Sequence, residues 1–135
     1  MTRWIATLLL VLTLAACRSA GAPAPRVASL SEEIQLAPSE QVVFGQSLNV
    51  QFIRVVEDSR CPSDVTCVWA GEVKIEVSTR IDDAAAERHE VTSSEPATVG
   101  AFRIVVVQVQ PEKISTRPIA PEEYRVTLKV QPASG

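Results

Sequence analysis

The sequence predicts an all-β domain, an antiparallel β-sandwich with an immunoglobulin-like arrangement; a partly open β-barrel is the alternative. Short segments in which apolar and polar residues alternate recur along the chain, and turn-forming residues separate them. Nine prolines are spread over 135 residues, which is a length that fits one domain. No segment shows the apolar periodicity of a long helix, so about six to eight short strands are expected.

The first 16 residues are predicted to be a signal peptide. Arg3 supplies a positive charge near the N-terminus, and residues 5–16 are apolar apart from two threonines. A run of about a dozen apolar residues is too short to span a membrane comfortably, and it is typical of an exported protein.

The end of this run, Leu14-Ala15-Ala16-Cys17, resembles the lipobox of bacterial lipoproteins. In that family the peptidase cuts before the cysteine, which carries a diacylglyceryl group on its sulfur. The resemblance implies that Cys17 is the first residue of the mature protein and its membrane anchor. An ordinary signal peptide with a chance cysteine is the alternative.

Residues 17–30 are rich in small residues and proline, and they are expected to form the lipidated N-terminus and a flexible tether. In lipoproteins of Gram-negative bacteria, an aspartate after the cysteine marks retention in the inner membrane. Arg18 therefore favours a protein anchored in the outer membrane and facing the periplasm, if the source has two membranes. The folded domain is expected over residues 31–132, with a loose tail at 133–135.

Alternation within the domain predicts most of the strands. The expected strands are residues 34–36, 42–44, 48–55, 73–81, 89–92, 102–109 and 124–131. The alternation slips at Phe52-Ile53, which predicts a β-bulge or a strand covered on both faces. Residues 82–85 are expected to form a turn, with a short helical turn over 83–88 as the alternative. The strand at 102–109 is apolar at nearly every position, so both its faces are expected to be covered.

The three cysteines are expected to divide into one lipidated residue and one disulfide. If Cys17 carries lipid, Cys61 and Cys67 remain, and an exported protein meets an oxidising compartment in which such a pair forms a disulfide. Zinc is the weaker alternative for these two cysteines, because it needs two further ligands and the chain has one histidine.

The segment around the disulfide has the densest turn chemistry in the chain. Pro62 presets the backbone of a turn, and Gly71 is expected where a side chain would not fit. Trp69 lies two residues after Cys67 and is expected to cover the sulfur atoms as part of the core. An exposed indole that serves as a binding platform is the alternative.

Charged residues flank the same segment. Arg60 is expected to pair with Asp58 or Asp64, rather than to bind an anionic ligand. Glu57, Asp58 and Asp64 are oxygen ligands of the kind that calcium prefers. They are expected instead to cap turns and to face water, so no metal site and no cofactor are predicted.

The run from Asp58 to Gly71, D-S-R-C-P-x(4)-C-x-W-A-G, resembles a signature of small bacterial lipoproteins and secreted proteins of uncharacterised function. The resemblance covers Phe52 to about Val77, and the closing strand at residues 124–130 matches only in style. It implies an envelope protein and supplies neither an activity nor catalytic residues.

No catalytic constellation is visible. His89 is the only histidine and lies in a polar segment without a recognisable nucleophile, so it is expected at the surface. The adjacent acids Asp82-Asp83 and Glu122-Glu123 would point to opposite faces of a strand, so neither pair suits glycoside chemistry.

The expected function is that of a membrane-anchored, non-enzymatic envelope lipoprotein that binds a protein partner or supports envelope structure. The alternative is an inhibitor-like module that presents the Cys61–Cys67 loop to an envelope enzyme. Loss of residues 1–16 removes one of 13 basic residues and none of the 16 acidic ones, so the net charge changes from −3 to −4. Without a basic patch, nucleic acid is not an expected partner.

Overall fold

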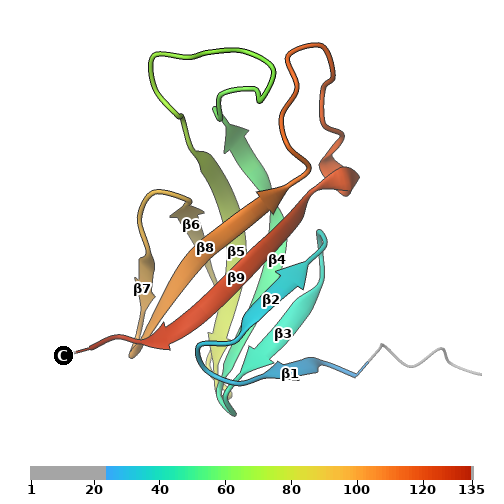
Figure 1. Cartoon of the computed structure of the whole chain (residues 1–135). Coiled ribbons are helices and arrows are strands. Elements are labelled where there is room, and N and C mark those ends of the chain that lie inside the picture. Colours follow the sequence, from blue (N-terminus) through green and yellow to red (C-terminus); the bar gives the residue numbers. More distant parts are fainter. Residues whose placement is uncertain (1–23, 135) are drawn as a thin grey trace, which may run out of the picture.

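Two β-sheets stacked face to face form the domain (Figure 1). The computed structural model describes residues 24–134. The predicted signal peptide and the predicted lipidation site, Cys17, lie outside the described residues. None of the described residues forms a helix long and apolar enough to cross a membrane.

The first sheet has five strands in the order β1-β3-β4-β5-β6. In that order, their bounds are Arg26–Ala28, Gln41–Phe44, Leu48–Asp58, Val73–Ile81 and Glu87–Thr92. β1 pairs with β3 in parallel, and the other neighbours are antiparallel. Strands β3 to β6 therefore form a meander, in which each strand pairs with the next one along the chain.

The second sheet has four antiparallel strands in the order β2-β9-β8-β7. In that order, their bounds are Glu33–Leu36, Arg125–Pro132, Phe102–Gln110 and Ala97–Val99. One turn of 3₁₀ helix, η1 (Pro121–Glu123), precedes β9. Because β2 lies in this sheet while β1 and β3 lie in the other, the first part of the domain contributes to both layers.

This architecture confirms the predicted β-sandwich, and the two sheets are not closed into a barrel. The first sheet is mixed, because β1 runs parallel to β3, whereas only antiparallel pairs were expected. The strand order also differs from that of an immunoglobulin domain, in which consecutive strands B and C lie in different sheets. Here β3, β4, β5 and β6 all stay in one sheet.

Alternating side chains place one face of each long strand in the core. In β5 every second residue from Val73 to Thr79 is buried, and the residues between them, such as Lys74, are partly exposed. β9 shows the same pattern. The buried side chains form one cluster, in which Phe44 and Phe52 are the largest that are fully buried. Full burial of each such side chain is worth about 1.5–3 kcal/mol, so this cluster is the main source of stability.

The predicted bulge in β4 is present. Phe52 pairs with Val77 and Arg54 pairs with Glu76, so Ile53 has no partner in the ladder. The inserted residue reverses the faces to which Arg54 and Val55 point, which accounts for the slip in the sequence pattern. A second register shift, between Val55 and Glu57, restores the original alternation at the end of the strand.

The predicted turn at residues 82–85 is present, without the alternative helical turn. Three other features differ from the predictions. β1 belongs to the sandwich although it falls in the expected tether, and Ala28 is buried there. β7 was not predicted, because its three residues are too few to show alternation. The expectation that both faces of β8 are covered is wrong, since Val107 is exposed on the outer face of the sheet.

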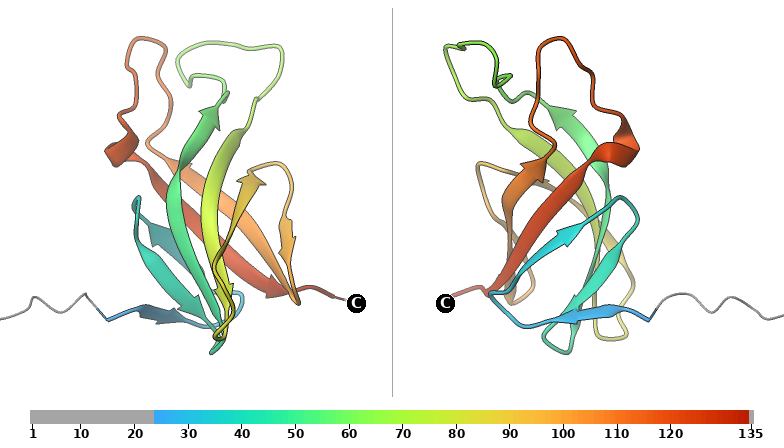
Figure 2. Two further views of the ribbon diagram at one scale, coloured as in Figure 1. Left: turned by 180° about the vertical axis from the view of Figure 1, so that it is seen from behind. Right: turned by 45° about the vertical axis from the view of Figure 1, so that its right-hand side comes forward.

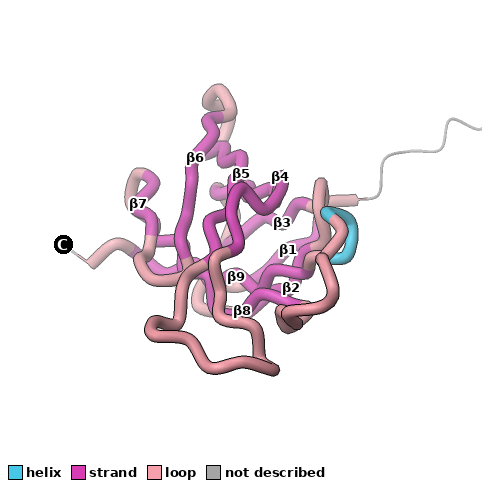
Figure 3. Tube along the Cα trace, turned by 90° about the horizontal axis from the view of Figure 1, so that it is seen from above, coloured by secondary structure: helices cyan, strands magenta, loops and turns pink. Residues whose placement is uncertain are grey.

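The two longest loops lie at one end of the sandwich, at the top of Figure 1. The disulfide loop (residues 59–72) joins β4 to β5, and the β8–β9 loop (residues 111–124) joins the two central strands of the second sheet. β1, through which the chain enters the domain, lies at the opposite end in each view of Figures 1 and 2. Figure 3 looks onto the end that carries the two loops.

Candidate functional site

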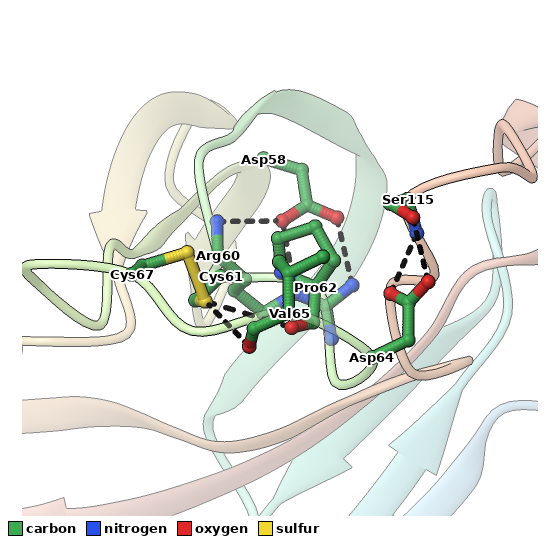
Figure 4. The surroundings of a disulfide bond; sticks show 8 residues. All are labelled: Asp58, Arg60, Cys61, Pro62, Asp64, Val65, Cys67 and Ser115. Atoms are coloured by element: carbon green, nitrogen blue, oxygen red, sulfur yellow. Dashed lines mark hydrogen bonds and ion pairs between the residues drawn. A yellow bond between two sulfur atoms is a disulfide. The ribbon is translucent and has the colours of Figure 1, made fainter.

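The disulfide that the sequence predicts is present in the disulfide loop. Cys61 and Cys67 are bonded, and their Cα atoms are 5.9 Å apart (Figure 4). The backbone N–H of Val65 donates to the carbonyl of Pro62 at 3.3 Å, which closes a turn within the bridged segment. The carbonyl oxygens of Pro62 and Val65 lie 3.5 and 3.7 Å from the sulfur of Cys61. These are contacts rather than hydrogen bonds, because a disulfide sulfur carries no proton.

Backbone pairing continues beyond the ends of β4 and β5. The N–H of Ser59 donates to the carbonyl of Glu72 at 2.9 Å, and the N–H of Glu72 donates to the Ser59 hydroxyl at 3.0 Å. The N–H of Cys61 donates to the carbonyl of Ala70 at 2.8 Å. The two arms of the disulfide loop are therefore held together between the sheet and the disulfide.

Gly71 permits this close approach, as predicted. Its φ angle is +68°, which favours glycine. A Cβ atom at this position would lie 1.8 Å from the carbonyl oxygen of Ser59. Both the conformation and the space therefore exclude any side chain.

Asp58 and Arg60 form the predicted ion pair at the base of the disulfide loop. The Arg60 side chain donates through Nε to Asp58 Oδ1 at 2.9 Å and through Nη2 to Oδ2 at 2.7 Å. The Asp58 side chain is only 8% exposed. The hydroxyl of Tyr124, which immediately precedes β9, donates to Asp58 Oδ2 at 3.0 Å. This three-residue cluster joins the first sheet to the second.

The ionisation of the cluster reflects its surroundings. Burial alone would raise the pKa of Asp58, but the hydrogen bonds and the positive charge of Arg60 outweigh it and lower the pKa. Hydrogen bonding to Asp58 raises the pKa of Arg60. Burial, together with the nearby charge of Asp58, raises the pKa of Tyr124 to about 12.

Arg60 and Lys113 extend the connection to the end of β8. The guanidinium of Arg60 also donates to the carbonyls of Val109 and Pro111, at 2.8 and 3.1 Å. In return, Lys113 Nζ donates to the carbonyl of Asp58 at 2.7 Å. The side chain of Arg60 therefore connects the disulfide loop to the second sheet, and its hydrogen-bond donors are used within the protein rather than for an anionic ligand.

Asp64 clamps the disulfide loop to the β8–β9 loop (Figure 4). Its carboxylate accepts hydrogen bonds from the backbone N–H of Ser115 at 2.9 Å and from the Ser115 hydroxyl at 2.6 Å. These bonds lower the pKa of Asp64. The N–H of Ser63 donates to the carbonyl of Lys113 at 2.8 Å. The two loops are therefore one structural unit at this end of the sandwich.

Trp69 does not cover the disulfide, and the prediction that it belongs to the core is wrong. Its side chain is 81% exposed, and that of Val68 beside it is 94% exposed. The prediction assumed that β5 begins before Trp69, so that side chains two residues apart would share a face. The strand begins only at Val73, and Trp69 lies in a bend.

The other candidate residues do not assemble a reactive site. Asp58 was expected to face water but is largely buried, because it is bound to Arg60 and Tyr124. Asp64 is bound to Ser115 instead. Within residues 24–134, no three His, Cys, Asp or Glu side chains are arranged to hold a metal ion. His89 lies in β6 and is half-buried rather than at the surface; its Nε2 atom lies 3.7 Å from the exposed carboxylate of Glu87. No hydroxyl or thiol nucleophile is hydrogen-bonded to His89 in this part of the chain.

Sequence reasoning missed three residues of the site. Tyr124 was counted only as an apolar residue in the alternation of the last strand. A buried tyrosine hydroxyl usually has a hydrogen-bond partner, but the sequence did not indicate which residue that partner is. Lys113 and Ser115 gave no signal, because their partners lie about 50 residues away in the chain.

Comparisons of the chain with protein-family models, with curated proteins and with solved structures gave no match.

Proposed function

We propose that this protein is a lipid-anchored module of the bacterial cell envelope that binds a partner protein through the disulfide loop, without catalysing a reaction. The observation that supports the binding role is the exposure of Val68 and Trp69 in a loop fixed by a disulfide and by hydrogen bonds. Large apolar side chains held rigidly in water are typical of binding anchors, because little conformational entropy is lost on association.

The same exposure favours a narrower second candidate. If the disulfide loop enters the active site of an envelope enzyme, the protein acts as its inhibitor. Such a loop must keep its shape inside the cleft, and the clamp between Asp64 and Ser115 supports this requirement.

Lipid anchoring rests on the sequence around Cys17 and is tested by metabolic labelling. Cells that express the full chain are grown with a labelled fatty acid. The wild-type protein is expected to incorporate the label and to sediment with membranes, whereas Cys17→Ser is expected to do neither. Cys61→Ser/Cys67→Ser is the matched control and should retain both properties. Labelling of the Cys17→Ser variant would contradict the proposal.

Binding through the disulfide loop is tested by the size of the native assembly in mild detergent extracts. The wild-type chain is expected to migrate in a larger complex that Val68→Ser disrupts. Val27→Ser is the matched control, since Val27 is also an exposed valine, 71% accessible, but lies in β1 at the other end of the domain. A complex that survives Val68→Ser and is lost with Val27→Ser would refute this use of the loop.

A further inference from the structure

The exposed apolar side chains of the domain gather at the end that carries the two loops. Seven large hydrophobic residues within residues 24–134 are exposed. Four of them lie in the disulfide loop or the β8–β9 loop, namely Val65, Val68, Trp69 and Ile114. Scattered single apolar residues need no explanation, but a group on two clamped loops marks an interaction surface.

Acidic residues accompany this apolar group. The two loops contain five acidic and three basic residues. Both arginines are already paired with acids, Arg60 with Asp58 and Arg117 with Glu123. The third basic group, Lys113, donates to the backbone of β4.

Two of the acids at this end have side chains that could contact a partner. Glu112 and Glu122 are exposed, and no salt bridge within residues 24–134 engages either of them. Glu112 and Glu122 lie at the same end of the domain as the apolar group. A surface that carries both complements a surface of positive charge and is repelled by one of negative charge.

We propose that the two loops together bind a protein whose surface has an apolar pocket bordered by basic side chains. In this arrangement Trp69 and Val68 enter the pocket, and Glu112 and Glu122 face the basic border. This inference rests on the proposed function and specifies the chemistry of the partner.

A membrane surface fits the loop end less well than such a protein. Anionic headgroups would be repelled by the acids, and the loops lie at the end of the domain opposite to β1, which leads from the predicted anchor (Figures 1 and 2).

The test begins with crosslinking in the source cells. The photoreactive residue p-benzoylphenylalanine replaces Trp69 in the full chain, and it replaces Asp83 in the β5–β6 turn as a control. A discrete protein adduct is expected from position 69 and not from position 83. In parallel, the purified domain is mixed with vesicles of phosphatidylethanolamine and phosphatidylglycerol, and with isolated peptidoglycan sacculi. Neither is expected to bind it.

The crosslinked protein is then purified and titrated with the domain. Trp69→Ala is expected to weaken the affinity about tenfold or more, as for a central anchor. Raising the salt from about 0.05 to 0.5 M should weaken binding severalfold, because it screens the acidic border. Glu112→Lys/Glu122→Lys should weaken binding about tenfold, whereas Asp83→Lys, a charge reversal at the opposite end, should change it by less than about twofold.

The outcomes separate this inference from the proposed function. If an adduct forms and binding is insensitive to salt and to Glu112→Lys/Glu122→Lys, the loop binds a protein but the basic partner is refuted. If vesicles or sacculi bind the wild-type domain and not Trp69→Ala, the loop is a binding surface for lipid or glycan, and the protein partner is refuted. If position 69 yields no adduct and neither probe binds, both proposals fail.

Discussion

Asp58 is the residue at which the two sheets and the disulfide loop meet. Its carboxylate accepts hydrogen bonds from the side chain of Arg60, the backbone N–H of Arg60 and the hydroxyl of Tyr124. A charge that is largely removed from water is tolerated only when it is paired and hydrogen-bonded, and all of these donors are supplied at the base of the loop. A pair of this kind fixes the geometry of the loop base even where its net stabilisation is small.

Replacing Asp58 by Asn should therefore destabilise the domain by about 2–3 kcal/mol, because Arg60 loses its charge partner. Tyr124→Phe removes one hydrogen bond and should cost about 1 kcal/mol. The double variant should lose less than the sum of the two by about 0.5 kcal/mol or more. Urea unfolding of all four proteins measures this coupling, and strict additivity would show that the Tyr124–Asp58 bond contributes nothing.

Gly71 allows a second prediction, which has a control within the chain. Gly71→Ala should cost about 3 kcal/mol or more, because it adds a clash with Ser59 to an unfavourable φ angle. Gly45 also has a positive φ, of +63°, but its Cβ would meet nothing closer than 3.7 Å. Gly45→Ala should therefore cost only about 1–2 kcal/mol. Equal losses of unfolding free energy would argue against the close approach at Gly71.

At the scale of elements, the disulfide loop is held by several independent connections. Its arms pair through backbone hydrogen bonds, Arg60 ties its base to β8, and Asp64 clamps its turn to the β8–β9 loop. The disulfide closes only the outermost part of the loop. The shape of the loop therefore depends on contacts with the second sheet as well as on the covalent bond.

Removal of the disulfide should lower stability without unfolding the sandwich. Closing a loop of about seven residues is worth about 2.3 kcal/mol in the chain-entropy model. Neither cysteine belongs to the buried core. Cys61→Ala/Cys67→Ala should thus lose about this free energy in urea unfolding and keep the far-ultraviolet circular dichroism of the wild type. Loss of the β signal at neutral pH would mean that the loop is needed for folding.

At the scale of the whole molecule, stability should depend on pH at both extremes. Asp58, Asp64 and Glu76 have lowered pKa values in the folded state, so the unfolded chain binds protons more readily in acid. Their contribution is complete above the unfolded values, about 3.9 and 4.3, and is lost as the pH falls below them. Tyr124 acts in the opposite range, since its pKa is raised and its contribution is lost as the pH rises above about 10.

Urea unfolding measured across this range should therefore show a plateau between about pH 5 and 9, with losses on both sides. Asp58→Asn should reduce the acid loss, and Tyr124→Phe should reduce the alkaline one. The chain has one tyrosine, so the difference between wild type and Tyr124→Phe isolates the tyrosine part of the alkaline loss. An increase in stability on acidification from pH 5 to pH 3 would contradict the lowered pKa values of the three carboxylates.

The alternation of apolar and polar residues was enough to predict the strands that are long enough to show it. Alternation located β5 and β9, and the slip at Phe52-Ile53 located the bulge in β4. The cysteine count, together with the expected export and lipidation of Cys17, predicted the Cys61–Cys67 bond. Each of these depends on residues near one another in the chain or on a simple count. The short strands β1 and β7 were not predicted, because three residues are too few to show alternation. Their pairing depends on strands that lie elsewhere in the sequence.

The amino-acid sequence by itself determined that the chain forms a β-sandwich with a disulfide between β4 and β5, because side-chain alternation and cysteine pairing are encoded locally. Only the tertiary structure decided that Trp69 faces water and that Asp58, Tyr124 and Ser115 belong to one end of the molecule. Those placements depend on where β5 begins and on how β8 and β9 pass the disulfide loop. They arise from contacts between residues 51 and 66 positions apart in the chain, for which no local pattern exists.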